Sequence, residues 1–331
     1  MNLSLRTFFL CLIPVVLFVT LSALTGVSTF GLPDLSTPLG AALLDVRLCR
    51  IATGFVVGAG LASSGCVLQT VLRNALAEPY ILGVSSGGAL GAALVIATGL
   101  SVLSPFALPA GAFAMAALTL AGVYLMTYGA AERSSQTLIL NGVVVGSMLS
   151  SLLMMVLSFS KVQAVHSITW WLLGNLQATS WSMVAVVAVL VLLSLALLCL
   201  ESRSLDALCL GHEHAQYLGV SLKRVIPVVL LCATLSAAAA VALSGIIGFV
   251  GLIVPHAVRR LVGHRHGVLL PYVALLGGTF VVVCDWLARL LFMPREIPVG
   301  VVTSLLGGPF FFYLLVHAKR RAFTSESRGN L

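Results

Sequence analysis

The stretch "SGIIGFVGLIVPHAVRR", residues 244–260, could be a phosphate-binding loop or a broken membrane helix. Gly245, Gly248 and Gly251 recur at every third position, Pro255 follows them, and two arginines close the apolar run. A phosphate-binding loop needs a lysine directly after its glycines. None of the chain's three lysines follows a glycine. The stretch is therefore interpreted as a membrane helix with a small-residue break, which its arginines end at a membrane surface.

The composition outside this stretch is that of an integral membrane protein. Of 331 residues, 60% are hydrophobic and 8% are charged, and the mean hydropathy is +1.11. Soluble domains are nearer ~45–50% apolar. A helix needs about 20 apolar residues to cross the bilayer core. A single all-α transmembrane domain over residues 1–331 is predicted, with about ten spans at 8–29, 51–72, 81–103, 107–129, 137–159, 181–200, 224–244, 246–262, 268–291 and 298–317.

The lysines and arginines predict the orientation, because cytoplasmic loops retain positive charge. With the N-terminus inside, thirteen of the 18 basic residues lie on the inner side. Both termini are therefore expected to be cytoplasmic. The net charge of +8 indicates topology and contact with anionic lipid rather than nucleic-acid binding. The outer basic residues are Arg47, Arg50, Lys161, Arg289 and Arg295.

The segments between the spans are too short to hold a receptor, an ATPase or a catalytic domain. A short outer interfacial helix is expected at about 166–176, where tryptophans are frequent. The inner segment 201–224 mixes charged and apolar residues, and Gly211 and Gly219 divide it into two amphipathic pieces. It is either a docking platform or a solvated linker.

Histidine and cysteine do not form a metal-binding pattern. His212 and His214, and likewise His264 and His266, are two residues apart and point in different directions on a helix. They are interpreted as surface histidines. The seven cysteines form no CxxC pair. No metal site and no bound cofactor are predicted for this chain.

One acid, Asp285, lies deep within a predicted span, and Arg289 follows four residues later. Residues at this spacing can pair on one helix face. The pair is either structural, or Arg289 joins Arg47 and Arg50 in a positive outer rim. Such a rim would bind carboxylates of a partner protein.

Several stretches together resemble the permease subunits of bacterial ABC importers for vitamin B12, ferric siderophores and haem. They occur in the family's order and cover nearly the whole chain. They are "VRLCR" with "GAGLASSGCVLQTVLRNALAEPYILGVSSGGALGA" (46–92), "WWLLGNLQATSW", "LGHEHAQYLGV", "LSGIIGFVGLIVPHAVRRLVGHRH" and "REIPVGVVTSLLGGPFFFYLL".

The resemblance implies a transport subunit of the inner membrane with ten helices, and not an enzyme. It implies a second permease copy, expected as a homodimer around a central pathway. Two cytoplasmic ABC ATPase subunits would bind ATP and Mg²⁺, and a periplasmic protein would deliver the substrate. ATP hydrolysis would drive alternating access, which would carry a metal chelate into the cytoplasm.

The resemblance also implies roles for individual residues. The binding-protein docking residues would be Arg47, Arg50 and Arg289. The ATPase coupling segment would span about 205–222, with Leu210, Gly211, Glu213, Ala215, Leu218 and Gly219 matching the family pattern. The inner gate would comprise Asn74, Leu76, Ser134 and Ser135.

Three positions depart from the family's usual pattern. Ala75 stands where proline is usual, so the gate loop loses one fixed backbone dihedral. Cys49, between Arg47 and Arg50, also stands where proline is usual. Lys161 stands where the B12 permease has a small polar residue. With His166, it would give the outer vestibule a positive bias suited to an anionic chelate.

Two other classes of function are weighed against an importer subunit. A secondary transporter driven by an ion gradient would need a buried carboxylate at mid-membrane, and Asp285 is the one candidate. An intramembrane enzyme would need a nucleophile beside a base, and His256 is the one histidine within an apolar run.

Overall fold

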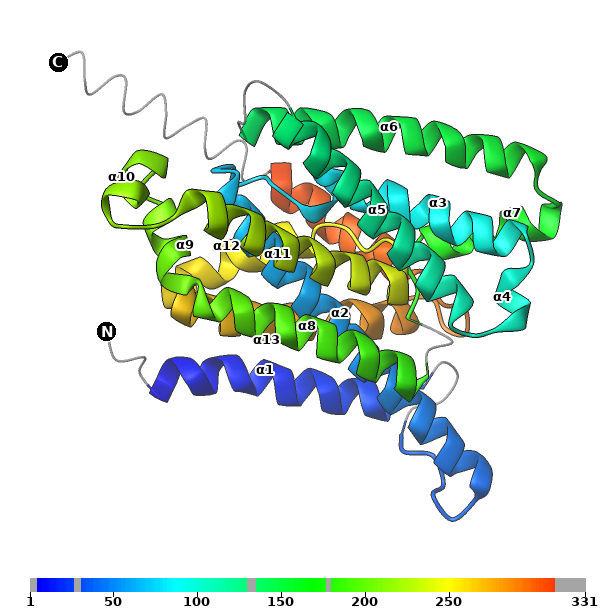
Figure 1. Ribbon diagram of the computed structural model, residues 1–331. Helices are drawn as coiled ribbons and strands as arrows, with labels where there is room; N and C mark the ends of the chain where they lie inside the picture. The colour runs from blue at the N-terminus through cyan, green and yellow to red at the C-terminus, as the bar shows by residue number, and fades with distance from the viewer. Residues whose placement is uncertain (1–4, 27–30, 130–134, 177–179, 313–331) are drawn as a thin grey trace.

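The computed structural model describes residues 5–26, 31–129, 135–176 and 180–312, which form an all-α bundle (Figure 1). The elements are α1 (Leu5–Leu24), α2 (Pro38–Val71), the 3₁₀ helix η1 (Pro79–Leu82), α3 (Val84–Ala97), α4 (Leu100–Leu103), α5 (Ala107–Gly129), α6 (Ser135–Phe159), α7 (Val162–Leu172), α8 (Trp181–Leu200), α9 (Ser202–Leu208), α10 (His212–Tyr217), α11 (Leu222–Ser244), α12 (Val250–Val262), α13 (His266–Leu290) and a last helix, Val299–Phe312.

Each of the ten predicted spans corresponds to a helix, so the predicted fold class is confirmed. The helices are α1, α2, α3, α5, α6, α8, α11, α12, α13 and the last one. Among the described residues, six helices are long and apolar enough to cross a membrane: α2, α5, α6, α8, α11 and α13. α3 and α12 are shorter than a full span, and so is the described part of the last helix.

The start of α2 was predicted thirteen residues too late. Thr37 caps this helix, because its hydroxyl accepts a hydrogen bond from the Gly40 N–H at 3.1 Å, and Pro38 occupies the first helical position. The resulting 34 residues extend about 50 Å at 1.5 Å per residue. α2 therefore continues beyond the apolar layer and carries Arg47 and Arg50 as part of the helix.

The predicted span 81–103 is broken at both ends. Gly83 and Gly99 have φ angles of 79° and 78°, a left-handed conformation that favours glycine. Gly83 separates η1 from α3, and Gly99 separates α3 from α4. The helix between them has only 14 residues.

The stretch 244–260 contains the predicted break, at residues 245–249 between α11 and α12. Gly245 has a φ of 72°, and a Cβ there would overlap the carbonyl oxygen of Trp171. Gly251 packs against Gly65 of α2, whereas Gly248 faces open space. α12 therefore begins at Val250, four residues later than predicted.

α2 lies at the centre of the bundle and packs along α13 (Figure 1). At the middle of this pair the backbones are in contact, because a Cβ on Gly58 would overlap the carbonyl oxygen of Gly277. α11 and α12 also pack against α2, while α3, α5 and α6 form a second group. In the most apolar part of α2, 83% of the residues are buried inside the protein, whereas in the corresponding part of α6 only 22% are buried.

Candidate functional site

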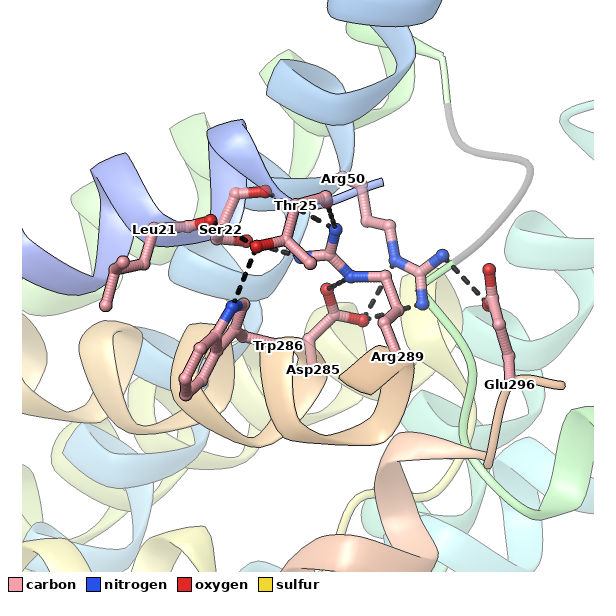
Figure 2. Close-up of polar contacts among 8 residues, drawn as sticks. All are labelled: Leu21, Ser22, Thr25, Arg50, Asp285, Trp286, Arg289 and Glu296. Carbon is pink, nitrogen blue, oxygen red and sulfur yellow. Dashed lines mark hydrogen bonds and ion pairs between the residues drawn. The ribbon is translucent and has the colours of Figure 1, made fainter. Parts of the chain in front are cut away.

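The two ends of the α2–α13 pair carry the polar groups that the apolar bundle buries. At one end lies the arginine cluster, which consists of Arg50, Asp285, Arg289 and Glu296 (Figure 2). Arg50 contacts Asp285 Oδ1 through Nε at 2.9 Å and Nη2 at 2.8 Å, and it reaches Glu296 Oε2 through Nη1 at 3.0 Å. Arg289 Nε lies 3.2 Å from Asp285 Oδ2. The predicted pairing of Asp285 with Arg289 is thus confirmed.

The same end of α13 holds α1 in place. The Arg289 guanidinium donates to the Thr25 carbonyl and to the Ser22 hydroxyl, and Trp286 Nε1 donates to Thr25 Oγ1 at 3.1 Å (Figure 2). Arg47 donates to the backbone carbonyls of Ala23 and Gly31, at 3.0 and 2.9 Å. These arginines therefore supply donors to the end of α1 and the residues that follow it.

The arginine cluster is buried and balanced in charge. Asp285 and Arg289 are each 2% exposed, and the Arg50 and Glu296 side chains are largely buried. Two guanidiniums face two carboxylates within the cluster. Glu296 was not singled out from the sequence, because it is 246 positions from Arg50. Its one local signal is its place in "REIPVG", before the last helix.

α7 carries the two residues predicted for the outer vestibule. It spans Val162–Leu172 rather than about 166–176, because Gly174, with a φ of 77°, ends it. Lys161 precedes the helix and lines a cavity of about 740 Å³. His166 stacks on Trp170, with ring centroids 6.3 Å apart, and lines a second cavity of about 690 Å³. The two cavities share Ile96, Ser101 and Ser167, so they adjoin.

α6 exposes a face that differs from that of α8. The α6 stripe is exposed along the helix and consists of Leu140, Val144, Ser147, Ser151, Met155 and Ser158. Each of its serines donates to the carbonyl four residues earlier in the helix. These hydroxyls therefore offer only their acceptor lone pairs, and no free donor, to a ligand. From Ala185 onward, the exposed side chains of α8 are all apolar, as on a lipid-facing helix.

The gate residues predicted after α2 form a tight turn. Asn74 Oδ1 accepts from the Leu76 N–H at 2.9 Å, and the Asn74 carbonyl accepts from the Ala77 N–H at 3.1 Å. This side-chain bond supplies the local constraint that proline at position 75 would provide. Arg73, before the turn, has a φ of 50°.

Ser135 is the first residue of α6 and lines a cavity of about 260 Å³ with Leu72 and His212. The end of α2, the start of α6 and α10 therefore meet at this cavity. Ser134 lies outside the described residues.

The segment predicted for ATPase coupling folds as α9 and α10, the platform. Gly211 and Gly219, with φ angles of 111° and 85°, bound α10 as predicted. The platform is anchored by the buried side chains of Leu205, Leu208 and Ala215. Four of the predicted coupling residues face outward: Leu210, Glu213, Leu218 and Gly219; Gly211 and Ala215 are buried. With Tyr217 also exposed, the platform presents an apolar patch, which favours docking over a solvated linker.

A hydrogen-bonded chain beneath the platform was missed from the sequence. His266 was interpreted as a surface histidine, and that prediction is wrong, since it is 1% exposed. Its ring contacts Asp206 of α9 and Thr70 of α2. No local pattern indicates the chain, because its members are 60 and 196 positions apart. Nearby, burial and then the Asp206 carboxylate raise the pKa of the Cys209 thiol.

Metal ligands do not gather in the described part of the chain. Among the described residues there is no group of three or more His, Cys, Asp or Glu side chains that could hold a metal ion. The seven cysteines are all free thiols.

Comparison with known proteins finds the same architecture in transport proteins. The model of the FecCD transport family matches residues 7–317. The chain is 41% identical over 296 residues to the cobalamin import system permease protein BtuC of Halobacterium salinarum, covering 88% of this chain and 77% of that one. It is 36% identical over 287 residues to the hemin transport system permease protein HmuU of Yersinia pestis, covering 84% of each.

A solved structure of an inward-facing ABC transporter of the metal-chelate type is similar throughout. It has a TM-score of 0.83 and 35% sequence identity, and the match covers 94% of this chain and 99% of that one.

Proposed function

This chain belongs to the FecCD transport family and is the membrane-spanning permease subunit of an ABC importer, and from that premise we propose that it moves a metal chelate into the cytoplasm by alternating access. It is a multi-pass protein of the inner membrane and a transport component rather than an enzyme. ATPase and substrate-binding partners are therefore expected. The proposed cargo class covers ferric siderophores, haem and cobalamin.

The α6 stripe is the observation that carries this proposal. In a single subunit it leaves three serines and Met155 exposed on a helix whose most apolar part is only 22% buried. A second copy facing it would enclose these side chains between the two subunits. Because the serine hydroxyls bond their own helix, such a surface would hold a bulky chelate weakly and let it pass. We therefore propose a homodimer with the pathway between the α6 stripes.

The platform is the proposed contact for two cytoplasmic ATPase subunits. Its exposed Leu210, Tyr217 and Leu218 offer apolar area, and the adjacent Glu213 adds a charge for orientation. ATP binding and hydrolysis would move α9 and α10. The gates at 74–76 and 134–135 would then open and close. We propose that both chain termini face the cytoplasm, on the basis of the distribution of lysines and arginines.

The opposite end is the proposed docking side for the periplasmic binding protein. Arg47, Arg50 and Arg289 are the proposed docking residues, and Asp285 and Glu296 already hold two of them. Carboxylates of the binding protein would have to compete with these internal acids. Docking would thereby exchange partners within the arginine cluster and loosen the end of α2 and α13.

The secondary-transporter alternative gains no support from the described residues. Asp285, its candidate ion site, is 2% exposed and bonded to both Arg50 and Arg289. Both oxygens of this carboxylate already contact a guanidinium, which leaves neither of them free for a transported cation.

Reconstitution into lipid vesicles with the partner ATPase and binding protein tests the proposal. We expect ATP-dependent accumulation of one of three probes, namely hemin, ferrichrome or cyanocobalamin, and none without the ATPase. Uptake driven by an imposed ion gradient with no ATPase would contradict it.

The positive bias at α7 has a matched test in the same vesicles. For an anionic probe, Lys161→Ala should lower uptake, while Gln163→Ala, which alters another residue of the same cavity, should not. Equal uptake by both variants would show that Lys161 has no part in selecting the substrate.

A further inference from the structure

A hydrogen-bonded chain links the platform to the end of α2. Asp206 on α9 accepts from the His266 backbone N–H at 2.8 Å, and the same oxygen lies 2.7 Å from His266 Nδ1. His266 Nε2 lies 2.9 Å from Thr70 Oγ1, in the last turn of α2. The chain therefore crosses from a short surface helix to the central helix through one buried ring.

The chemistry of the three groups sets the direction of each bond. An ionised carboxylate only accepts, so His266 Nδ1 carries a hydrogen and donates to Asp206. The Thr70 hydroxyl also lies 3.1 Å from the Cys66 carbonyl. The Cys209 thiol is also a side-chain hydrogen-bond partner of Thr70, so the single hydrogen of this hydroxyl goes to Cys66, His266 or Cys209. Because the ring is 1% exposed, both of its nitrogens depend on these protein partners.

The end of α2 that receives this chain continues directly into the gate loop, residues 73–77. The Asn74 N–H donates to the Gln69 carbonyl at 3.1 Å, one residue before Thr70. The Gln69 side chain is itself held by α12, since its Nε2 donates to the Gly251 carbonyl at 2.9 Å and its Oε1 accepts from Arg259. A displacement of Thr70 would therefore be passed to Asn74 over less than one and a half helical turns.

The buried leucines of α9 transmit a displacement less specifically than these hydrogen bonds do. Leu205 and Leu208 are fully buried, but apolar contacts have no preferred direction and permit sliding. The Asp206–His266–Thr70 bonds are directional, and each fixes one atom of one element against the next.

Resting on the function proposed above, we propose that Asp206 and His266 are positioning residues that transmit movement of the platform through Thr70 to the gate loop. They contact neither substrate nor nucleotide in this role. Their effect is on how strongly the gate responds to the ATPase.

The test measures the gate loop directly and needs no transported substrate. Ala75, which is exposed in the loop, is replaced by cysteine in a chain whose exposed Cys209 is replaced by serine. The permease is assembled with its ATPase in lipid nanodiscs. Its reaction rate with a polar maleimide is measured with and without Mg²⁺ and a non-hydrolysable ATP analogue.

Thr70→Val and Asp206→Ala break the chain at its two ends. The matched control is Thr279→Val on α13, because Thr279 is also buried and donates to the carbonyl four residues earlier. We expect the nucleotide-dependent change in labelling rate to fall at least about 5-fold in both variants, and to persist in the control. The double variant should fall no further than the single ones, since one chain is broken twice.

The amount of ATPase that co-purifies should stay at the wild-type level, which separates lost transmission from lost docking. A wild-type nucleotide response in Thr70→Val or in Asp206→Ala would overturn the proposal. If Asp206→Ala does not fold, Thr70→Val decides alone. A wild-type complex that binds no ATPase, or whose gate loop ignores nucleotide, would instead contradict the proposed function.

Discussion

The two ends of the α2–α13 pair are held by different chemistry. The arginine cluster joins ionised groups of α2, α13 and the segment before the last helix, and its charges balance within a buried volume. The other end joins α2 and α13 by hydrogen bonds through one imidazole, and its single carboxylate belongs to the short helix α9. At the arginine-cluster end, every ion pair joins groups that belong to the bundle itself. The other end extends to a surface element on which a partner can act.

This difference shows how one helix pair can be rigid and still respond to a partner. The glycine contact between Gly58 and Gly277 brings the two backbones together at the middle, so α2 and α13 should move as one body. Loss of the arginine cluster should therefore affect stability more than transmission. Loss of the Asp206 chain should affect transmission more than stability.

The largest effect is expected from Asp285→Ala at the arginine cluster. The substitution leaves Glu296 alone to balance two buried guanidiniums, and uncompensated buried charge costs about 3–5 kcal/mol. Unfolding by a denaturing detergent should show a loss of this size in the free energy of unfolding.

The double variant Asp285→Ala/Arg289→Met provides the control, because it removes one charge of each sign. It should recover a large part of the loss. If Asp285→Ala unfolds like the wild type, the cluster is not what holds this end together.

A smaller effect is expected at the shared middle of the pair. In Gly58→Ala the new methyl group would overlap the Gly277 carbonyl and push the helices apart, at a cost of about 1–3 kcal/mol. Gly122→Ala on α5 has open space and should be neutral or slightly stabilising. Thermal unfolding of both variants in the same detergent makes the comparison, and similar midpoints would argue against backbone contact between α2 and α13.

Next in size is the stability change in Thr70→Val at the platform end. The substitution removes one partner of His266 Nε2 and should cost about 1 kcal/mol. Thr279→Val, which loses only a bond within its own helix, should stay within about 0.5 kcal/mol of wild type. A cost as large as that of Asp285→Ala would show that both ends are structural in the same way.

The smallest effect is expected from salt. Buried ion pairs are screened much less than exposed ones, and the arginine cluster is buried. Raising NaCl from about 0.1 to about 1 M should therefore change the unfolding free energy by less than about 0.5 kcal/mol. A salt-dependent loss above about 1 kcal/mol would mean that the cluster opens to water in solution.

Local signals in the sequence account for the helices that were predicted well and for the ends that were not. Apolar runs located all ten spans, because burial in lipid requires long apolar segments. Helix ends depend on single residues, such as the Thr37 cap that starts α2 early and the left-handed Gly83 and Gly99 that shorten α3. The break at 245–249 was visible as a glycine pattern, although only packing shows that Gly245 and Gly251, and not Gly248, are in close contact.

In the candidate site, contacts between residues close in the sequence could be predicted, whereas contacts between distant residues could not. Asp285 and Arg289 are four residues apart on one helix, so their pairing could be predicted from spacing. Arg50 and Glu296 are 246 positions apart, and only the fold brings them into contact with each other beside this pair. His266 was interpreted as a surface histidine because no metal-binding pattern surrounds it in the sequence, and it is buried because Asp206 and Thr70 approach it from other helices.

The membrane class, the approximate spans and the family could all be predicted from the amino-acid sequence, because each of these follows from composition, local pattern or motif order. The tertiary structure decided which charges neutralise one another, which glycines permit contact between helices, and which polar residues bridge the platform to α2. These depend on contacts between residues far apart in the chain. Their energies arise only when packing removes the groups from water and brings their partners within hydrogen-bond distance.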